Sequence, residues 1–136
     1  MRGDKAFFDT TVILYALAKD DARAEVAEAL LAAGGVISVQ ILNEFVAVAS
    51  RKLGMPWDDV LAALDAILIL CPSPAPLMIE THQMALGIAR KYKYHIYDAL
   101  VIASAIEASC TTLYSEDLQD GQAIGGLTIR NPFQTG

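Results

Sequence analysis

Short apolar segments alternate with longer helical patterns along this chain of 136 residues, and this alternation most constrains the fold. Strand-like segments are expected at residues 5–9, 36–39, 68–71, 112–114 and 127–130. Helical patterns are expected at residues 12–18, 21–33, 40–53, 57–67, 76–91 and 97–109. Strands that alternate with helices favour a mostly parallel sheet with helices on both faces. We therefore expect one α/β domain spanning residues 1–136.

The composition excludes several classes of protein. A hydrophobic fraction of 54% with only 19% charged residues excludes a disordered chain. No apolar run reaches the roughly 18–20 residues of a membrane-spanning helix, so no membrane association is expected. Cys71 and Cys110 form no Cys-x-x-Cys pair, which favours buried free thiols in a reducing cytoplasm. The net charge of −6 argues against binding nucleic acid through bulk positive charge.

Four acidic residues stand apart from the solvated acids on helix faces. The carboxyl ends of parallel strands lie at one edge of a sheet, which is where sites form in open α/β folds. One acid ends the first strand, one follows the second strand–helix junction, one begins a long apolar helix, and one follows a late strand. These residues are Asp9, Glu44, Asp98 and Asp117. The topology therefore predicts that they lie near one edge.

Each of these acids also has a simpler interpretation. Asp9 could be a helix N-cap, and Asp98 could be a cap or a first-turn partner of the helix dipole. Glu44 could lie exposed on the polar side of its helix, and Asp117 could belong to a polar turn. The interpretation as a site depends on all four acids lying near one another.

Carboxylates that converge repel one another unless a cation lies between them. Oxygen ligands of this kind suit Mg²⁺ and Mn²⁺. Two such ions about 3.5–4 Å apart stabilise the attacking and leaving oxygens when a phosphodiester is cleaved. The four acids therefore indicate a nuclease that uses one or two divalent metal ions.

The same residues carry a resemblance to a known family. The segment Phe8-Asp9-Thr10-Thr11-Val12, then Glu44, then Tyr97-Asp98-Ala99-Leu100, then Ser115-Glu116-Asp117, resembles the PIN-domain ribonucleases, and most of all the VapC-type toxins of toxin–antitoxin pairs. This resemblance covers essentially the whole chain. It implies a three-layer α/β/α sandwich with a short, mostly parallel central sheet. It also implies Mg²⁺- or Mn²⁺-dependent endonucleolytic cleavage of single-stranded RNA.

The resemblance assigns roles residue by residue. Asp9, Glu44 and Asp98 match the three core acids of the family, and Asp117 matches the fourth. Asp120 could assist as a metal ligand, and the choice between Asp117 and Asp120 stays open. Two hydroxyl residues match positions that order the site in the family. These are Ser115 and Thr11, and many members carry Asn or Ser in place of Thr11.

Basic residues gather just before Asp98. Arg90, Lys91 and Lys93 alternate with two tyrosines, and bases that contact phosphates beside rings that stack on nucleobases are typical of an RNA path. Basic residues at the end of a helix also interact favourably with its dipole, which is the simpler interpretation.

The resemblance further implies a homodimer and a small antitoxin that blocks the acidic site. Two other functions remain as alternatives. A non-catalytic PIN-like module could bind RNA or protein without cleaving it. A haloacid-dehalogenase-type phosphatase is the less favoured alternative, because its Asp-x-Asp motif would need an aspartate where the chain has Thr11.

Overall fold

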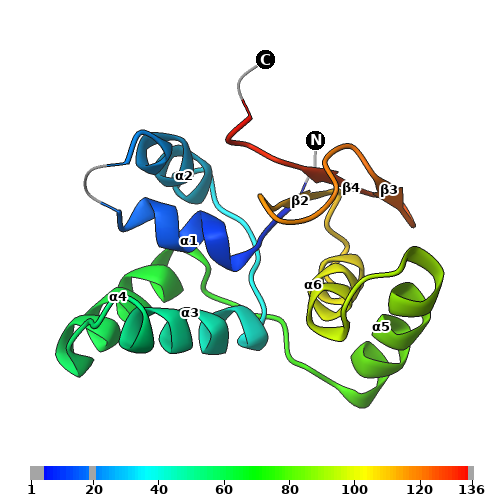
Figure 1. The fold of residues 1–136 in the computed structure, drawn as a ribbon, viewed down its shortest axis with the longest axis horizontal. Coiled ribbons are helices and arrows are strands. Elements are labelled where there is room, and N and C mark those ends of the chain that lie inside the picture. The colour runs from blue at the N-terminus through cyan, green and yellow to red at the C-terminus, as the bar shows by residue number, and fades with distance from the viewer. Residues whose placement is uncertain (1–4, 19–20, 135–136) are drawn as a thin grey trace.

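The computed structural model describes residues 5–18 and 21–134 (Figure 1). The six predicted helices are all present, with ends that differ by at most three residues from the predicted ones. In chain order the elements are β1 (Ala6–Phe8), α1 (Thr10–Ala16), α2 (Arg23–Ala32), α3 (Val39–Arg51), α4 (Trp57–Leu70), α5 (Ile79–Tyr92), α6 (Ile96–Glu107), β2 (Thr112–Tyr114), β3 (Ala123–Ile124) and β4 (Leu127–Arg130).

The strands form one four-stranded sheet in the order β1-β2-β4-β3. β1 pairs with β2 and β2 with β4, both in parallel, and Phe8 lies opposite Tyr114. β3 is antiparallel to β4 at the far edge. Because β1 and β2 run in the same direction, the residues that follow them lie at the same edge of the sheet. The predicted α/β fold with a short, mostly parallel sheet is confirmed.

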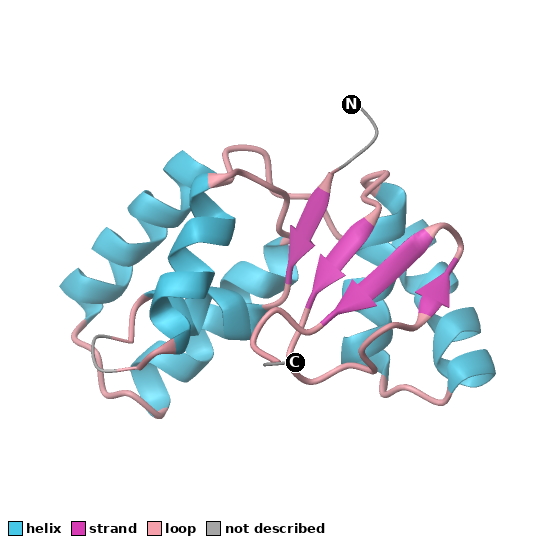
Figure 2. Ribbon diagram, turned by 90° about the horizontal axis from the view of Figure 1, so that it is seen from above, coloured by secondary structure: helices cyan, strands magenta, loops and turns pink. Residues whose placement is uncertain are grey.

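Burial along the strands shows where helices cover the sheet. Neighbouring residues of a strand point to opposite faces, and Phe7 and Phe8 of β1 are both fully buried. On β2, Leu113 is fully buried while Thr112 and Tyr114 are partly exposed. In Figure 2, α5 and α6 lie behind the sheet and α1–α4 gather beside β1. Both faces are therefore covered most completely at β1, the strand that leads into Asp9.

Two predicted strands are not strands in the structure. Residues 36–39 form only two isolated bridges, from Val36 to Phe7 and from Ser38 to Ala75, before α3 begins at Val39. Residues 68–71 instead continue and cap α4. The apolar run there resembles a buried strand, but only Ile67 and Cys71, four residues apart, are buried. That spacing is helical, and Ile69 between them is 79% exposed.

One strand was not predicted. β3 has only two residues and pairs with β4 across Gly125 and Gly126, both of which have positive φ. Consecutive glycines of this kind suit the tight turn of a β-hairpin, because side chains disfavour positive φ. In the described part of the chain, no helix has the length and apolar character needed to cross a membrane.

Candidate active site

Asp9 lies where β1 ends and α1 begins, and both interpretations made from the sequence apply to it. It is the N-cap of α1, with its Oδ1 accepting a 2.8 Å hydrogen bond from the Thr10 backbone N–H. Its Oδ2 accepts a 2.7 Å bond from the Ser115 hydroxyl, beyond the end of β2. The Asp9 N–H also donates to the Tyr114 carbonyl, which ties the two strand ends together. The cap is thus also a side chain at the predicted edge.

Burial raises the pKa of Asp9 to about 6. The hydrogen bonds from Ser115 and from the Thr10 backbone oppose this increase, because they stabilise the charged form. The carboxylates of Glu44 and Asp117 raise the pKa further by repulsion. Asp9 is therefore a carboxylate with two fixed donors that faces two other acids.

Glu44 of α3 is partly buried and faces the N-terminus of α1. Its Oε1 accepts a 2.6 Å bond from the Thr10 hydroxyl, and its Oε2 accepts a 3.1 Å bond from Gln40 Nε2. Gln40 Nε2 also donates to the Tyr97 carbonyl at 3.0 Å, in the first turn of α6. These contacts contradict the interpretation of Glu44 as an exposed surface glutamate. They connect α1, α3 and α6 around one carboxylate.

Asp98 and Asp117 complete the set of acids. Asp98 lies in the first turn of α6, as its simpler interpretation also required. Asp117 follows β2, and its backbone N–H donates to the Ser115 hydroxyl at 3.2 Å. Asp117 is exposed, but partial desolvation by its surroundings raises its pKa, and the charges of Glu116 and Asp98 raise it further. The four acids therefore lie in one electrostatic neighbourhood, in which Asp117 faces both Asp9 and Asp98.

Two other predicted residues lie differently. Asp120 is exposed, and its Oδ1 accepts a 2.7 Å bond from the Asn131 backbone N–H. The Thr11 hydroxyl is buried and has no hydrogen-bond partner among the described residues. Thr10, one position earlier, makes the contact with Glu44. Successive helix residues are turned by about 100°, so only one of these two threonines can face α3.

The model of the PIN domain family matches residues 6–119 of this chain. The chain belongs to the PIN domain family. The match contains Asp9, Glu44, Asp98 and Asp117 and ends just before Asp120. A search of curated proteins finds no significant match.

Solved structures share the PIN fold at low sequence identity. Mycobacterium tuberculosis VapC20, described as a sarcin-ricin loop cleaving toxin, is 20% identical with a TM-score of 0.66, over 83% of this chain and 90% of that one. A toxin–antitoxin complex from Klebsiella pneumoniae contains a chain that is 21% identical with a TM-score of 0.71, over 96% of this chain and 100% of that one. At such identities the likeness establishes the fold.

PIN nucleases generally use divalent metal ions, and the acids here suit such an ion by their chemistry. All four offer hard carboxylate oxygens, and a cation would relieve the repulsion from Glu44 and Asp117 that adds to the effect of burial on the Asp9 pKa. Among the described residues, no three side chains from His, Cys, Asp and Glu converge closely enough to bind one ion. Mg²⁺ commonly keeps several waters and uses only one or two protein carboxylates, so this spacing is compatible with it.

In the described part of the chain, the predicted RNA-contacting residues form no hydrogen bond or ion pair with the four acids. Arg90 and Lys91 occupy the last turn of α5, and Lys93 caps that helix in the left-handed conformation with φ of 62°. All three are exposed, and Lys91 Nζ lies 5.3 Å from the centre of the Tyr92 ring. Within the described ranges, no ion pair joins them to an acid.

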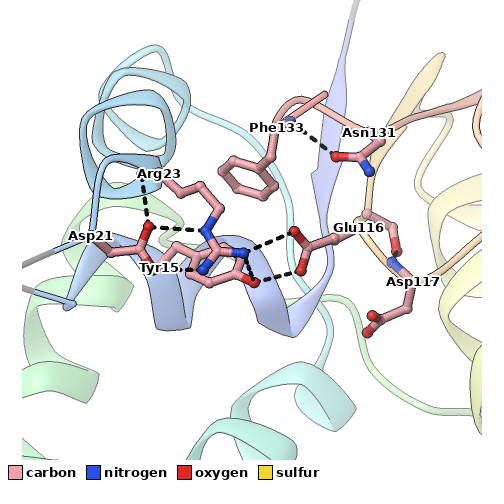
Figure 3. A network of polar contacts seen from close by, with 8 residues as sticks. Tyr15, Asp21, Arg23, Glu116, Asp117, Asn131 and Phe133 are labelled. Carbon is pink, nitrogen blue, oxygen red and sulfur yellow. Dashed lines mark hydrogen bonds and ion pairs between the residues drawn. The ribbon is translucent and has the colours of Figure 1, made fainter. Parts of the chain in front are cut away.

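A polar network beside the PIN acids was missed by the sequence analysis (Figure 3). Tyr15 of α1 donates a 2.5 Å bond to Glu116 Oε1, and Arg23 of α2 forms a 3.3 Å ion pair with Glu116 Oε2. Arg23 also pairs with Asp21 at 2.7 Å and lies 4.0 Å from the centre of the Tyr15 ring. No local pattern reveals it, because Glu116 is 101 residues from Tyr15.

Proposed function

We propose that this protein is a metal-dependent endoribonuclease that cleaves single-stranded RNA, and that it acts as the toxin of a toxin–antitoxin pair. One observation carries the proposal: Asp9, Glu44, Asp98 and Asp117 come from four separate segments and influence one another at the carboxyl edge of β1 and β2. Membership of the PIN domain family supports it, because members are typically nucleases. The fold likeness to VapC20, a sarcin-ricin loop cleaving toxin, is consistent with it.

In this proposal Asp9, Glu44, Asp98 and Asp117 hold one or two Mg²⁺ or Mn²⁺ ions. The bound ion supplies charge stabilisation for the scissile phosphate and activation of the attacking water. The chain's own residues orient the ligands. Ser115 donates to Asp9 Oδ2, which leaves the proton of the hydroxyl committed to that oxygen. Thr10 fixes both Asp9 and Glu44, because its backbone N–H donates to Asp9 and its hydroxyl donates to Glu44.

The RNA strand would approach from the exposed end of α5. Arg90, Lys91 and Lys93 are the exposed cations that immediately precede α6 and Asp98 in the chain. Cations of this kind contact phosphates without reading the base sequence. The net charge of −6 argues only against RNA binding through bulk positive charge. Local cations and bound metal ions would allow RNA to bind in this proposal.

An antitoxin partner fits the apolar surface between α1, α2 and α4. A hollow of about 310 Å³ lies there, and one of about 660 Å³ adjoins it between α1, the end of α3 and α4, with Leu17 and Ala63 lining both. Leu17, which lines both hollows, is 41% exposed, and an amphipathic segment would cover an apolar surface of this kind. The larger hollow is also lined by Tyr15, whose hydroxyl contacts Glu116 beside the acids. A partner docked there would reach the acidic site.

We also propose that the toxin is a homodimer and that it acts in the cytoplasm, where RNA is the substrate. The cytoplasmic assignment agrees with Cys71 and Cys110, which are both buried and unbridged. Burial raises the pKa of both thiols, as expected of structural and unreactive cysteines.

RNA cleavage by the purified full chain tests the proposed activity. We expect cleavage of an end-labelled single-stranded RNA in Mn²⁺ and none in EDTA. Asp9→Asn and Asp98→Asn should each reduce the rate by more than about 100-fold, since loss of even an outer-shell partner of a metal costs about 10–100-fold. Asp58→Asn, an acid in the first turn of α4, is the matched control and should cleave like wild type.

Two outcomes would contradict the proposal. Cleavage that survives in both Asp9→Asn and Asp98→Asn would exclude this site as the catalytic centre. RNA binding by wild type without any Mn²⁺-dependent cleavage would favour the non-catalytic PIN module. Circular dichroism of each variant separates loss of activity from loss of fold.

A further inference from the structure

The loop that carries Asp117 is attached to α1 at two points. At the N-terminus of α1, Asp9 accepts a hydrogen bond from Ser115. Toward the other end of the same helix, Tyr15 donates to Glu116. Ser115 and Glu116 are the two residues that directly precede Asp117, so α1 holds the loop on consecutive residues. Two attachments restrict the direction of the next side chain more than one attachment does.

The attachment through Glu116 is itself fixed by α2. Arg23 Nη1 donates to the Tyr15 hydroxyl at 2.7 Å and pairs with Glu116 Oε2, so one guanidinium contacts both members of the hydrogen bond. Asp21 holds the other side of that guanidinium with bonds of 2.9 Å to Nε and 2.7 Å to Nη2. The face of the Arg23 guanidinium lies on the Tyr15 ring, and Phe133 packs edge-on against that ring at 4.8 Å. The network is therefore preorganised around Glu116.

The two acids of the loop point in different directions. In Figure 3, Glu116 points toward Tyr15 and Arg23, while Asp117 points downward in the view and takes no part in their contacts. Arg23 offsets the negative charge of Glu116, which otherwise adds to the repulsion at Asp117. The network thus separates the two neighbouring carboxylates into different surroundings.

We propose that Tyr15 and Arg23 are positioning residues, which hold Glu116 and thereby direct Asp117 toward Asp9 and Asp98. The assignment rests on the proposed function for its consequence, because a misdirected Asp117 matters only where it binds a metal ion. Neither Tyr15 nor Arg23 touches the metal or the RNA in this mechanism.

If Tyr15 and Arg23 only stabilised the fold, a different experimental result would be expected. The side chain of Arg23 is 43% exposed and that of Glu116 is 27% exposed, and ion pairs this close to solvent add little to stability. A positioning role moves the loop while the stability of the whole chain stays near wild type. The two roles therefore separate when local and global measurements are made on the same variants.

The test compares Tyr15→Phe with Tyr114→Phe in the full chain. Tyr15→Phe removes one hydroxyl and keeps the ring under Arg23. Tyr114→Phe removes the hydroxyl of another partly buried tyrosine, whose side chain has no hydrogen bond within the described residues. Amide hydrogen exchange is followed at Asp117 and Leu118, whose N–H groups donate to the Ser115 hydroxyl. Mn²⁺ affinity without RNA is measured from the electron paramagnetic resonance signal of free Mn²⁺.

We expect Tyr15→Phe to speed exchange at Asp117 and Leu118 by about tenfold, because a hydrogen bond to a charged group is lost. Mn²⁺ affinity and the cleavage rate at saturating RNA should fall by about tenfold, the lower end for an outer-shell partner. Tyr114→Phe should match wild type in all three measurements. Arg23→Lys, which keeps the charge but loses the planar fork, should reproduce the defect and serves if Tyr15→Phe does not fold.

Equal exchange and equal Mn²⁺ affinity in Tyr15→Phe and Tyr114→Phe would overturn the positioning role. The exchange measurement needs neither metal nor activity, so it remains decisive if the wild-type chain cleaves no RNA. Faster exchange in a chain without nuclease activity would support the positioning role and reject the proposed function. Normal cleavage by wild type together with unchanged exchange in Tyr15→Phe would support the proposed function and reject the positioning role.

Discussion

The two halves of the acidic site are held in different ways. In the first half, Asp9 and Glu44 each accept two hydrogen bonds, and Thr10 donates to both of them. In the second half, no hydrogen bond among the described residues reaches the carboxylate of Asp98 or Asp117. These two acids owe their positions to the first turn of α6 and to the loop after β2.

This difference indicates that the two halves would play different roles in binding a metal ion. Fixed donors around Asp9 and Glu44 keep two charges in place where they repel each other, which is the preorganisation that a metal site requires. No donor among the described residues fixes the carboxylates of Asp98 and Asp117, so within the direction set by their backbone they could adjust to an ion or a phosphate in the proposed function. In the proposed function, the first half would define the metal site and the second half would complete it.

The largest expected effect comes from substituting, one at a time, the two candidates for the fourth metal ligand, Asp117 and Asp120. Asp117→Asn should lower Mn²⁺-dependent RNA cleavage by more than about 100-fold. Asp120→Asn should leave the rate close to wild type, because Asp120 binds the Asn131 backbone instead of facing the other acids. Initial rates at saturating RNA check both. The opposite ranking would make Asp120 the ligand and assign Asp117 to a polar turn.

A second pair of variants tests the fixed half. Thr10→Val keeps the shape and removes the hydroxyl that donates to Glu44, so activity should fall about 10–100-fold and stability by about 1–3 kcal/mol. Thr11→Val removes a buried hydroxyl without a partner and should be neutral or stabilising. Urea denaturation and cleavage assays measure both effects. If Thr11→Val proves the more damaging, the ordering role belongs to Thr11, as the family resemblance implied.

A third prediction concerns the pH dependence of metal-free stability. Because the pKa of Asp9 is raised to about 6, the folded chain holds this proton more tightly than the unfolded chain. Stability should therefore fall as pH rises from about 4 to about 6, by up to about 3 kcal/mol, and stay low above that range. The Asp9→Asn variant should not show this decrease in stability, because asparagine does not titrate.

Denaturation of wild type and Asp9→Asn in EDTA, at several pH values, isolates the contribution of Asp9 as the difference between the two curves. The curves should diverge with rising pH, with the variant the more stable at pH 7. Parallel curves would show that burial and the neighbouring acids do not raise the pKa of Asp9 in the folded chain.

The sequence predicted where Asp9, Asp98 and Asp117 lie in the fold, because each ends, begins or follows an element that local pattern reveals. Phe7 and Phe8 indicate a buried strand, so the position of Asp9 at its end follows directly. Asp98 stands out as the acid at the start of an apolar helix. Such boundaries are set by residues close in the chain, and their meeting follows from parallel strands.

The partners of those acids could not be predicted in the same way. Gln40 bridges Glu44 and the carbonyl of Tyr97, 57 residues away, and Arg23 reaches Glu116 across 93 residues. On their own helices these residues look like ordinary polar positions. The strand predicted at residues 68–71 was wrong for a related reason: an apolar run does not show which of its faces another element will cover.

The pairing of β1 has a consequence for how the chain acquires activity during synthesis. β1 finds its partner in β2, whose residues 112–114 emerge more than 100 residues later. Contacts this distant in sequence form late, because a long loop must close first. At about 5–20 residues per second, the ribosome releases β2 several seconds after β1. A chain interrupted before residue 112 lacks the strand that pairs with β1 and brings Ser115 to Asp9, so incomplete translation products of this protein should be unable to cleave RNA.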